Sequence, residues 1–181
     1  MKGQNLKKNI YRIIISILLI WTFFIIFGFS NQNGKESSGI SKKITQIITT
    51  NIKYIQNLEE NQKNEITNRI EKIIRKLAHF SIYTLVGLLL MLLVNTYNLK
   101  LTNKIAITSI TGIIYAISDE IHQSFIPGRS PQVTDVLLDT MGVILGILWV
   151  ILVIKIKEKN VETCQKKSWK NTWYKKIFIV E

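Results

Sequence analysis

Four long apolar blocks dominate the pattern of the chain. They lie at residues 10–29, 77–95, 104–123 and 135–154. A hydrocarbon core of about 30 Å is crossed by roughly 20 consecutive apolar residues in a helix. A soluble domain would instead spread its apolar residues at helix or strand spacing. The pattern therefore predicts an all-α membrane protein with four transmembrane helices.

The polar segment between the first two blocks has a helical pattern of its own. Apolar residues, mostly isoleucine, recur about every 3.6 positions from Ile40 to Leu58 and again from Ile66 to Leu77. This spacing is typical of amphipathic helices that lie on a membrane surface or cover the spans. A solvated linker would leave that much isoleucine in water. We therefore expect an amphipathic helical outer segment between the first and second spans.

The charge of the chain and its placement indicate which class of partner the protein binds. The net charge is +12 although 47% of the residues are hydrophobic, and the Lys residues lie mostly outside the apolar blocks. Cytoplasmic loops and anionic lipid account for that placement, so we expect a lipid bilayer as partner and no nucleic acid. The single cysteine excludes an internal disulfide framework and a cysteine-based metal site.

These observations predict a domain plan and an orientation. We expect a basic cytoplasmic N-terminus over residues 1–9, a four-span membrane domain over residues 10–154, and a basic amphipathic cytoplasmic tail over residues 155–181. The first block lacks a small-x-small cleavage site, which favours an uncleaved span over a signal peptide. Both termini then lie in the cytoplasm, as in a multi-pass protein of the plasma membrane.

The cations at the start of the second span depart from this orientation. Arg75 and Lys76 come directly before the block that begins at Leu77, on the predicted outer side. The positive-inside rule places such residues on the other side of the membrane. Either they pair with carboxylates or they bind an anionic headgroup.

The predicted topology brings the polar residues of the spans into one layer. Lys76 and His79 begin the second span, Asp119 lies near the end of the third, and Asp135 and Asp139 begin the fourth. A polar stripe that faces lipid is costly, so the stripes are expected to face one another on the outer side. Gly142 and Gly146 form a small-xxx-small pair that lets another helix approach closely.

This layer contains candidate catalytic and binding residues. The candidate acid–base residues are His79, Asp119 and Glu120, because a histidine beside a carboxylate can transfer protons. The candidate binding residues are Lys76, Gln123, Arg129, Asp135 and Asp139. Arg129 and Lys76 would hold a phosphate or carboxylate, with arginine acting as a two-pronged donor.

Three alternatives stay open for the same residues. A purely structural cluster would use the charges to fix helix positions. A metal-dependent membrane hydrolase would use a metal site of His79, Asp119, His122 and Asp135, although HExxH is absent and Arg129 would repel an ion. A proton relay through Asp139 is weakened by the lack of an internal repeat. We expect no cofactor, and whether the protein is an enzyme stays open.

Several sequence pieces resemble those of a known family. They are FSNQ at 29–32, RKLAHFSIY at 75–83, SDEIHQSFIPGR at 118–129 and DVLLDTMGVILG at 135–146. Their order and spacing resemble the VanZ-like family of small bacterial membrane proteins over about residues 10–154. The family's pattern falls on Lys76, His79, Asp119, Glu120, Gln123, Arg129, Asp135, Gly142 and Gly146. Asp139 departs from it, because members often have asparagine there.

The resemblance implies a role at the cell envelope. The founding relative is an accessory protein that gives low-level resistance to teicoplanin, a glycopeptide antibiotic. By analogy, this protein is expected to bind or modify a lipid-linked cell-wall precursor or an anionic phospholipid headgroup, and so to contribute to teicoplanin tolerance. The family brings no established chemistry, and a homo-oligomer is one possible form of the protein.

Overall fold

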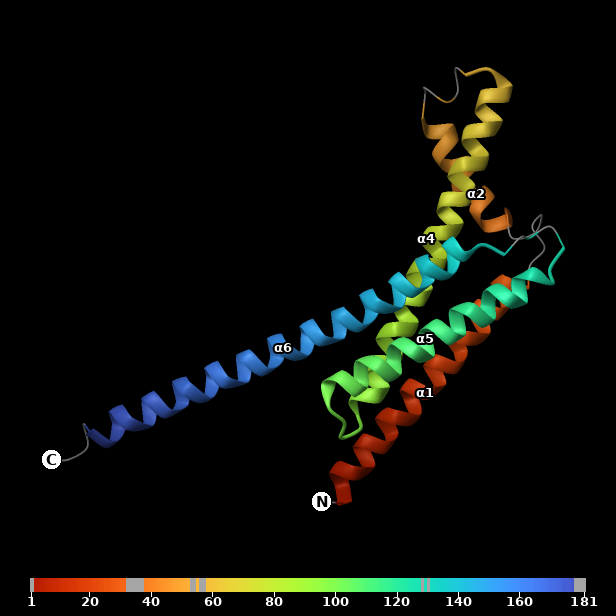
Figure 1. The fold of residues 1–181 in the computed structure, drawn as a ribbon. Helices are drawn as coiled ribbons and strands as arrows, with labels where there is room; N and C mark the ends of the chain where they lie inside the picture. The colour runs from red at the N-terminus through yellow and green to blue at the C-terminus, as the bar shows by residue number, and fades with distance from the viewer. Residues whose placement is uncertain are drawn as a thin grey trace. The chain divides into compact units, whose positions relative to one another are not determined.

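The computed structural model describes residues 2–31, 38–52, 55, 58–127, 129 and 131–177. The chain forms α1 (Lys2–Ser30), α2 (Ser38–Asn51), α4 (Glu60–Asn95), α5 (Leu101–Ser124) and α6 (Val133–Ile177), in that order (Figure 1). No strand occurs in this part of the chain. Helices α1, α4, α5 and α6 are each long and apolar enough to cross a membrane. The prediction of an all-α protein with four spans is confirmed.

The helices extend further than the apolar blocks that predicted them. The second span was predicted from Leu77, but α4 begins at Glu60 and runs for 36 residues. The apolar series that starts at Ile66 is therefore the first part of the same helix. The earlier isoleucine series lies largely on α2, an amphipathic helix between the first two spans as predicted. Hydropathy marks the part of a helix that lies in lipid, whereas backbone hydrogen bonds continue beyond it.

The chain divides into two compact units, residues 1–147 and residues 148–181, and α6 runs through the boundary. All the candidate site residues belong to the first unit. In the second unit α6 continues through the start of the predicted basic tail at Lys155, and the side chains from Lys155 to Thr163 are exposed. The attachment of this tail to the inner leaflet stays a prediction.

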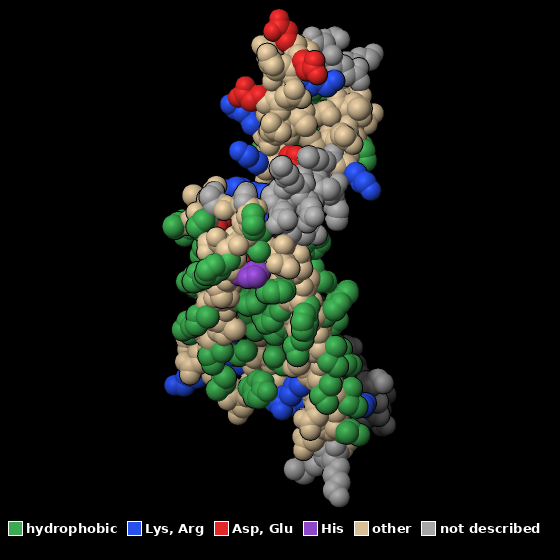
Figure 2. Space-filling model, turned by 90° about the vertical axis from the view of Figure 1, so that its right-hand side faces the viewer, with side chains coloured by type: hydrophobic (Ala, Val, Ile, Leu, Met, Phe, Trp, Pro, Cys, Tyr) green, Lys and Arg blue, Asp and Glu red, His purple; other side chains and the backbone are tan. Residues whose placement is uncertain are grey.

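Helix α4 is the centre of the first unit. It packs against α1, α2 and α5, and α1 also packs against α5. Tyr83, Val86 and Met91 of α4 have no exposed surface. On the outer faces of α1 and α5, large apolar side chains such as Phe24, at 70% exposure, remain uncovered. Figure 2 shows hydrophobic side chains covering a broad band, with Lys and Arg near both of its borders. Such a band is the surface that a bilayer covers.

Helix α6 approaches α4 at glycine. A Cβ added at Gly142 would lie 2.6 Å from the carbonyl oxygen of Phe80, and one added at Gly146 would overlap the backbone of Thr84. The glycines therefore allow backbone-to-backbone packing, which confirms the close approach predicted from their spacing. This contact places the first turns of α6 beside the middle of α4.

The opposite end of the unit is held by cations and neutral groups. Arg12 donates from Nε to Thr96 Oγ1 (2.9 Å) and from Nη2 to the Thr96 carbonyl (3.0 Å). Its guanidinium also lies 4.1 Å from the ring centroid of Tyr97. Lys104 Nζ donates to Asn95 Oδ1 at 2.8 Å. We call these five residues the basic end.

Candidate functional site

The last turns of α1 and α5 meet the middle of α4 and the first turns of α6. Hydrogen bonds, ion pairs and close approaches of polar atoms link side chains from all four helices. We call this group the polar end: Ser30, Lys76, His79, Asp119, Glu120, Gln123, Asp135 and Asp139. The structure thus brings together the layer that the topology predicted.

Asp119 is the most constrained of the predicted acid–base residues. Ser30 Oγ donates to its Oδ1 at 2.5 Å, and Gln123 Nε2 donates to its Oδ2 at 2.9 Å. Asp119 is 6% exposed and Ser30 is fully buried. Both carboxylate oxygens therefore accept hydrogen bonds from neutral donors, which fix the side chain and tie α1 to α5.

Lys76 and Asp135 form an ion pair. Lys76 Nζ lies 2.5 Å from Asp135 Oδ1, with side-chain exposures of 36% and 25%. The pair joins α4 to the first turn of α6. Of the two alternatives for the cations before the second span, pairing with a carboxylate holds for Lys76.

Glu120 and Arg129 stabilise the connections between helices. Glu120 is buried, and its Oε1 accepts the backbone N–H of Gln132 at 2.6 Å, just before α6. Arg129 Nη2 donates to the carbonyl of Phe29 at 3.1 Å, in the last turn of α1. Burial and the nearby charge of Arg75 lower the pKa of Arg129 below its ordinary value, while Asp119 and Glu120 raise it. The positive charge of Arg129 is therefore held at a cost that a nearby anion would reduce.

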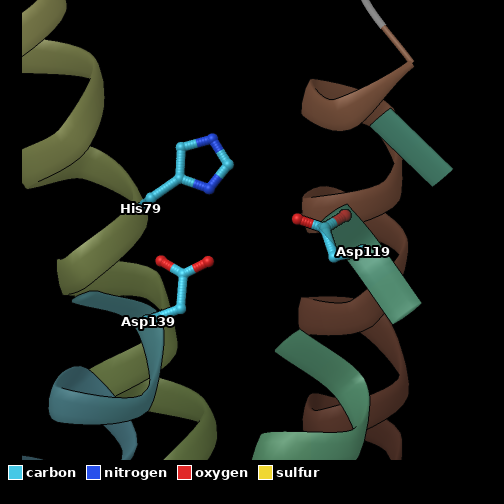
Figure 3. A group of neighbouring side chains, drawn as sticks. All are labelled: His79, Asp119 and Asp139. Carbon is cyan, nitrogen blue, oxygen red and sulfur yellow. The ribbon is translucent and has the colours of Figure 1, made fainter. Parts of the chain in front are cut away.

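His79, Asp119 and Asp139 converge from α4, α5 and α6. One nitrogen of His79 and one oxygen of each carboxylate all lie within 4.8 Å of one another. Figure 3 shows His79 above Asp139, with the carboxylate of Asp119 turned toward them. Asp139 is 3% exposed, and its Oδ1 has no hydrogen-bond partner among the described residues.

The other two residues of the sequence-based metal set lie apart from this group. His122 stacks on Phe27 of α1, with ring centroids 4.6 Å apart, and Asp135 is held in its ion pair with Lys76. Asp139 completes the cluster in place of His122 and Asp135. The i, i+3 spacing of Asp119 and His122 located the right helix but not the right pair of side chains.

A small pocket opens onto the polar end. It is lined by Arg75, Lys76, His79, Glu120, Gln123, Asp135, Leu138 and Asp139. The centre of a water molecule can move within a volume of about 10 Å³ in this pocket. The pocket therefore has room for one water molecule or one ion. Arg75 also lines a neighbouring pocket with Asn68, Glu71 and Lys72. No hydrogen bond or ion pair engages Arg75 within the described parts of the chain.

Two residues were not predicted as site residues, Ser30 of the polar end and Arg75 of the pocket lining. Ser30 stands in the predicted layer, but a serine at a helix end is most often a cap. Arg75 was set apart only by its position on the wrong side for the positive-inside rule. This position could have identified Arg75 as a site residue, because a cation placed against the rule needs a partner.

Comparison with known proteins agrees with this architecture. The family model for VanZ/LLP1 matches residues 13–155, which include all or most of each membrane-spanning segment and every residue of the polar end. No curated protein and no solved structure matches the chain. The chain therefore belongs to the VanZ-like (VanZ/LLP1) family of membrane proteins.

Proposed function

We propose that this VanZ-like protein binds the anionic headgroup of a lipid or a lipid-linked cell-wall precursor at the outer face of the plasma membrane. The observation that carries the proposal is Arg75. Its side chain lines the pocket, and none of the described residues offers it a hydrogen bond or an ion pair. A guanidinium binds phosphate through two parallel N–H donors, which makes it a specific anion ligand.

The surroundings of Arg75 also favour an anion. Arg75 and Arg129 are close enough for the charge of one to lower the pKa of the other. An anion between two guanidinium groups relieves their repulsion. Lys76 is already neutralised by Asp135, so Arg75 is the cation of this pair that is left for a ligand.

The orientation is part of the proposal. The basic end, with Arg12 and Lys104, would face the cytoplasm, and both termini would lie there. The polar end would then face the outer surface, where cell-wall precursors are used and where teicoplanin binds them. Through this site the protein would act on the envelope and contribute to teicoplanin tolerance.

The competing interpretation is a purely structural polar cluster. It accounts for Lys76–Asp135 and Ser30–Asp119, which join helices directly. It does not account for Arg75, which makes no hydrogen bond or ion pair with any residue that the structure describes. Arg75→Gln therefore separates the two interpretations, because it removes a ligand-binding charge without breaking a bond between helices.

The first experiment is antibiotic susceptibility in a sensitive Gram-positive host. It compares the wild type, Arg75→Gln, Arg129→Ala and Glu120→Gln at matched membrane levels. The control is Arg69→Gln, on the same helix, whose side chain is exposed and pairs with Glu65. We expect the wild type and Arg69→Gln to raise the inhibitory concentration of teicoplanin but not that of vancomycin. Arg75→Gln should lose the effect.

Headgroup binding is tested directly by native mass spectrometry of the purified protein. The probes are phosphatidylglycerol, a polyprenyl phosphate and phosphatidylcholine. We expect retention of one or both anionic lipids by the wild type and by Arg69→Gln, and weaker retention by Arg75→Gln. Preference for one anionic probe identifies its source. Equal retention of all three lipids by every variant would refute headgroup recognition.

A further inference from the structure

We propose that His79, Asp119 and Asp139 bind one divalent metal ion. The proposal goes beyond headgroup binding and does not depend on it. The first argument is geometric, because three different helices each direct one ligand atom into a space where these atoms lie within 4.8 Å of one another. Tetrahedral ligands at bonds of about 2.1 Å are about 3.4 Å apart. Side-chain movements of about 1 Å would close the cluster to that size.

The charges of the two carboxylates also favour a bound cation. Asp119 and Asp139 are buried, and neither belongs to an ion pair within the described part of the chain. Lys76, whose charge acts on Asp139, is engaged by Asp135, and Arg129, whose charge acts on Asp119, donates to the carbonyl of Phe29. Two carboxylates in membrane-spanning helices are costly unless a cation balances them or they share a proton. A divalent ion neutralises both.

The two carboxylates also differ in their hydrogen bonding. Asp119 is held in place by Ser30 and Gln123, as metal-binding carboxylates commonly are by groups behind them. Asp139 Oδ1 is buried and has no hydrogen-bond partner in the described chain. A buried acceptor without a donor is costly, and a metal ion is one partner that removes this cost. The site would thus contain one carboxylate that is held in place, Asp119, and one that lacks a partner for Oδ1, Asp139.

The donor set indicates the class of metal. One imidazole and two carboxylates suit a first-row divalent cation, and we commit to Zn²⁺ or Mn²⁺. Three protein ligands leave a coordination position open, as in catalytic rather than structural zinc sites. His79 and Asp139 both line the pocket that Arg75 also lines. An anion held by Arg75 could therefore complete the coordination of the ion.

The test is the metal content of the purified full-length protein. After removal of metal with EDTA and reloading with Zn²⁺ or Mn²⁺, the wild type should hold about one ion per chain. Asp139→Asn and His79→Gln should weaken binding by roughly 10-fold or more. The matched control is His122→Gln, the same change at the α5 histidine that stacks on Phe27 apart from the cluster, which should keep the ion. Arg75→Gln should also keep it, so loss of headgroup binding is distinguishable from loss of metal.

A thermal-unfolding readout makes the result independent of yield. Zn²⁺ or Mn²⁺ should raise the Tm of the wild type and of His122→Gln, and should leave the Tm of Asp139→Asn and His79→Gln unchanged. If Asp139→Asn does not fold, His79→Gln carries the test. A folded wild type that takes up neither ion would overturn the proposal in favour of two carboxyl groups that share a proton. Equal uptake by the wild type, His79→Gln and Asp139→Asn would also overturn it.

Discussion

The two ends of the helix bundle satisfy their charges in opposite ways. At the basic end, Arg12 is bound by a hydroxyl, a carbonyl and the ring of Tyr97, and no acid among the described residues pairs with it. At the polar end, carboxylates and cations are mixed, and neither Asp139 Oδ1 nor the neighbouring Arg75 side chain has a hydrogen-bond partner among the described residues. A fully satisfied end can serve as an anchor. Unsatisfied groups are more informative, because folding alone gives no reason to keep them.

The contrast between the two ends would fail most completely if they lay on the opposite sides of the membrane from those proposed. In a Cys164→Ala background, we expect Ser124→Cys at the polar end to react with a membrane-impermeant thiol reagent in intact cells. Lys100→Cys at the basic end should react only after permeabilisation. Both native side chains are exposed, so access is limited by the membrane and not by packing. Labelling of Lys100→Cys in intact cells would reverse the assignment of the two ends.

The next largest effect is expected from Gly142→Leu. The new side chain would meet the backbone of Phe80, separate α6 from α4 and push Asp139 away from His79. Overpacking against a backbone should cost more than about 3 kcal/mol of stability. Gly28→Leu is the matched control, because a Cβ there meets nothing within 4 Å. Thermal unfolding in detergent measures both, and equal Tm values would contradict the close approach of α4 and α6.

Arg12→Gln should affect the basic end alone. It removes two hydrogen bonds and a cation–ring contact, which should lower the free energy of unfolding by about 1–2 kcal/mol. Metal content and lipid retention should stay at wild-type values. Denaturant unfolding of Arg12→Gln beside Lys8→Gln, an exposed cation on the same helix, measures the difference. A loss of metal or lipid binding would show that the two ends are coupled.

The smallest effect concerns the ion pair of the polar end. A double-mutant cycle of Lys76→Met and Asp135→Asn should give a coupling energy of about 1 kcal/mol, because both side chains are partly exposed. The same cycle at Arg69 and Glu65, an exposed pair on α4, should give about 0.3 kcal/mol. A coupling at Lys76–Asp135 no larger than at Arg69–Glu65 would mean that this pair orders the site without stabilising the fold.

The fold was predictable because hydropathy is a long-range signal. Four apolar blocks gave four spans, and the requirement that polar stripes avoid lipid placed Asp119 and His79 in one layer. The helix ends were less predictable, since α4 starts at Glu60 in a sequence without an apolar block. A helix that leaves the bilayer loses its hydropathy signal but keeps its backbone hydrogen bonds.

The pairing within the layer could not be predicted. Sequence spacing shows which residues share a face of one helix, but not how that helix is rotated and shifted against its neighbours. The approach of α6 to α4 at Gly142 decides that Asp139 lies beside His79, while Asp135 meets Lys76 one turn earlier. His122 was predicted to face the other polar groups, but it stacks on Phe27 of α1. These outcomes depend on contacts between helices.

The distribution of the cluster over three helices has a consequence for biosynthesis. The ribosome delivers His79, Asp119 and Asp139 in that order, on helices that enter the membrane one after another. A nascent chain that ends before Val133 already contains α1, α4 and α5, yet it lacks the residue that completes the group. Until α6 arrives, Asp119 relies on Ser30 and Gln123 alone. The site can therefore form only after the start of α6, the last membrane-spanning helix, has reached the other three helices.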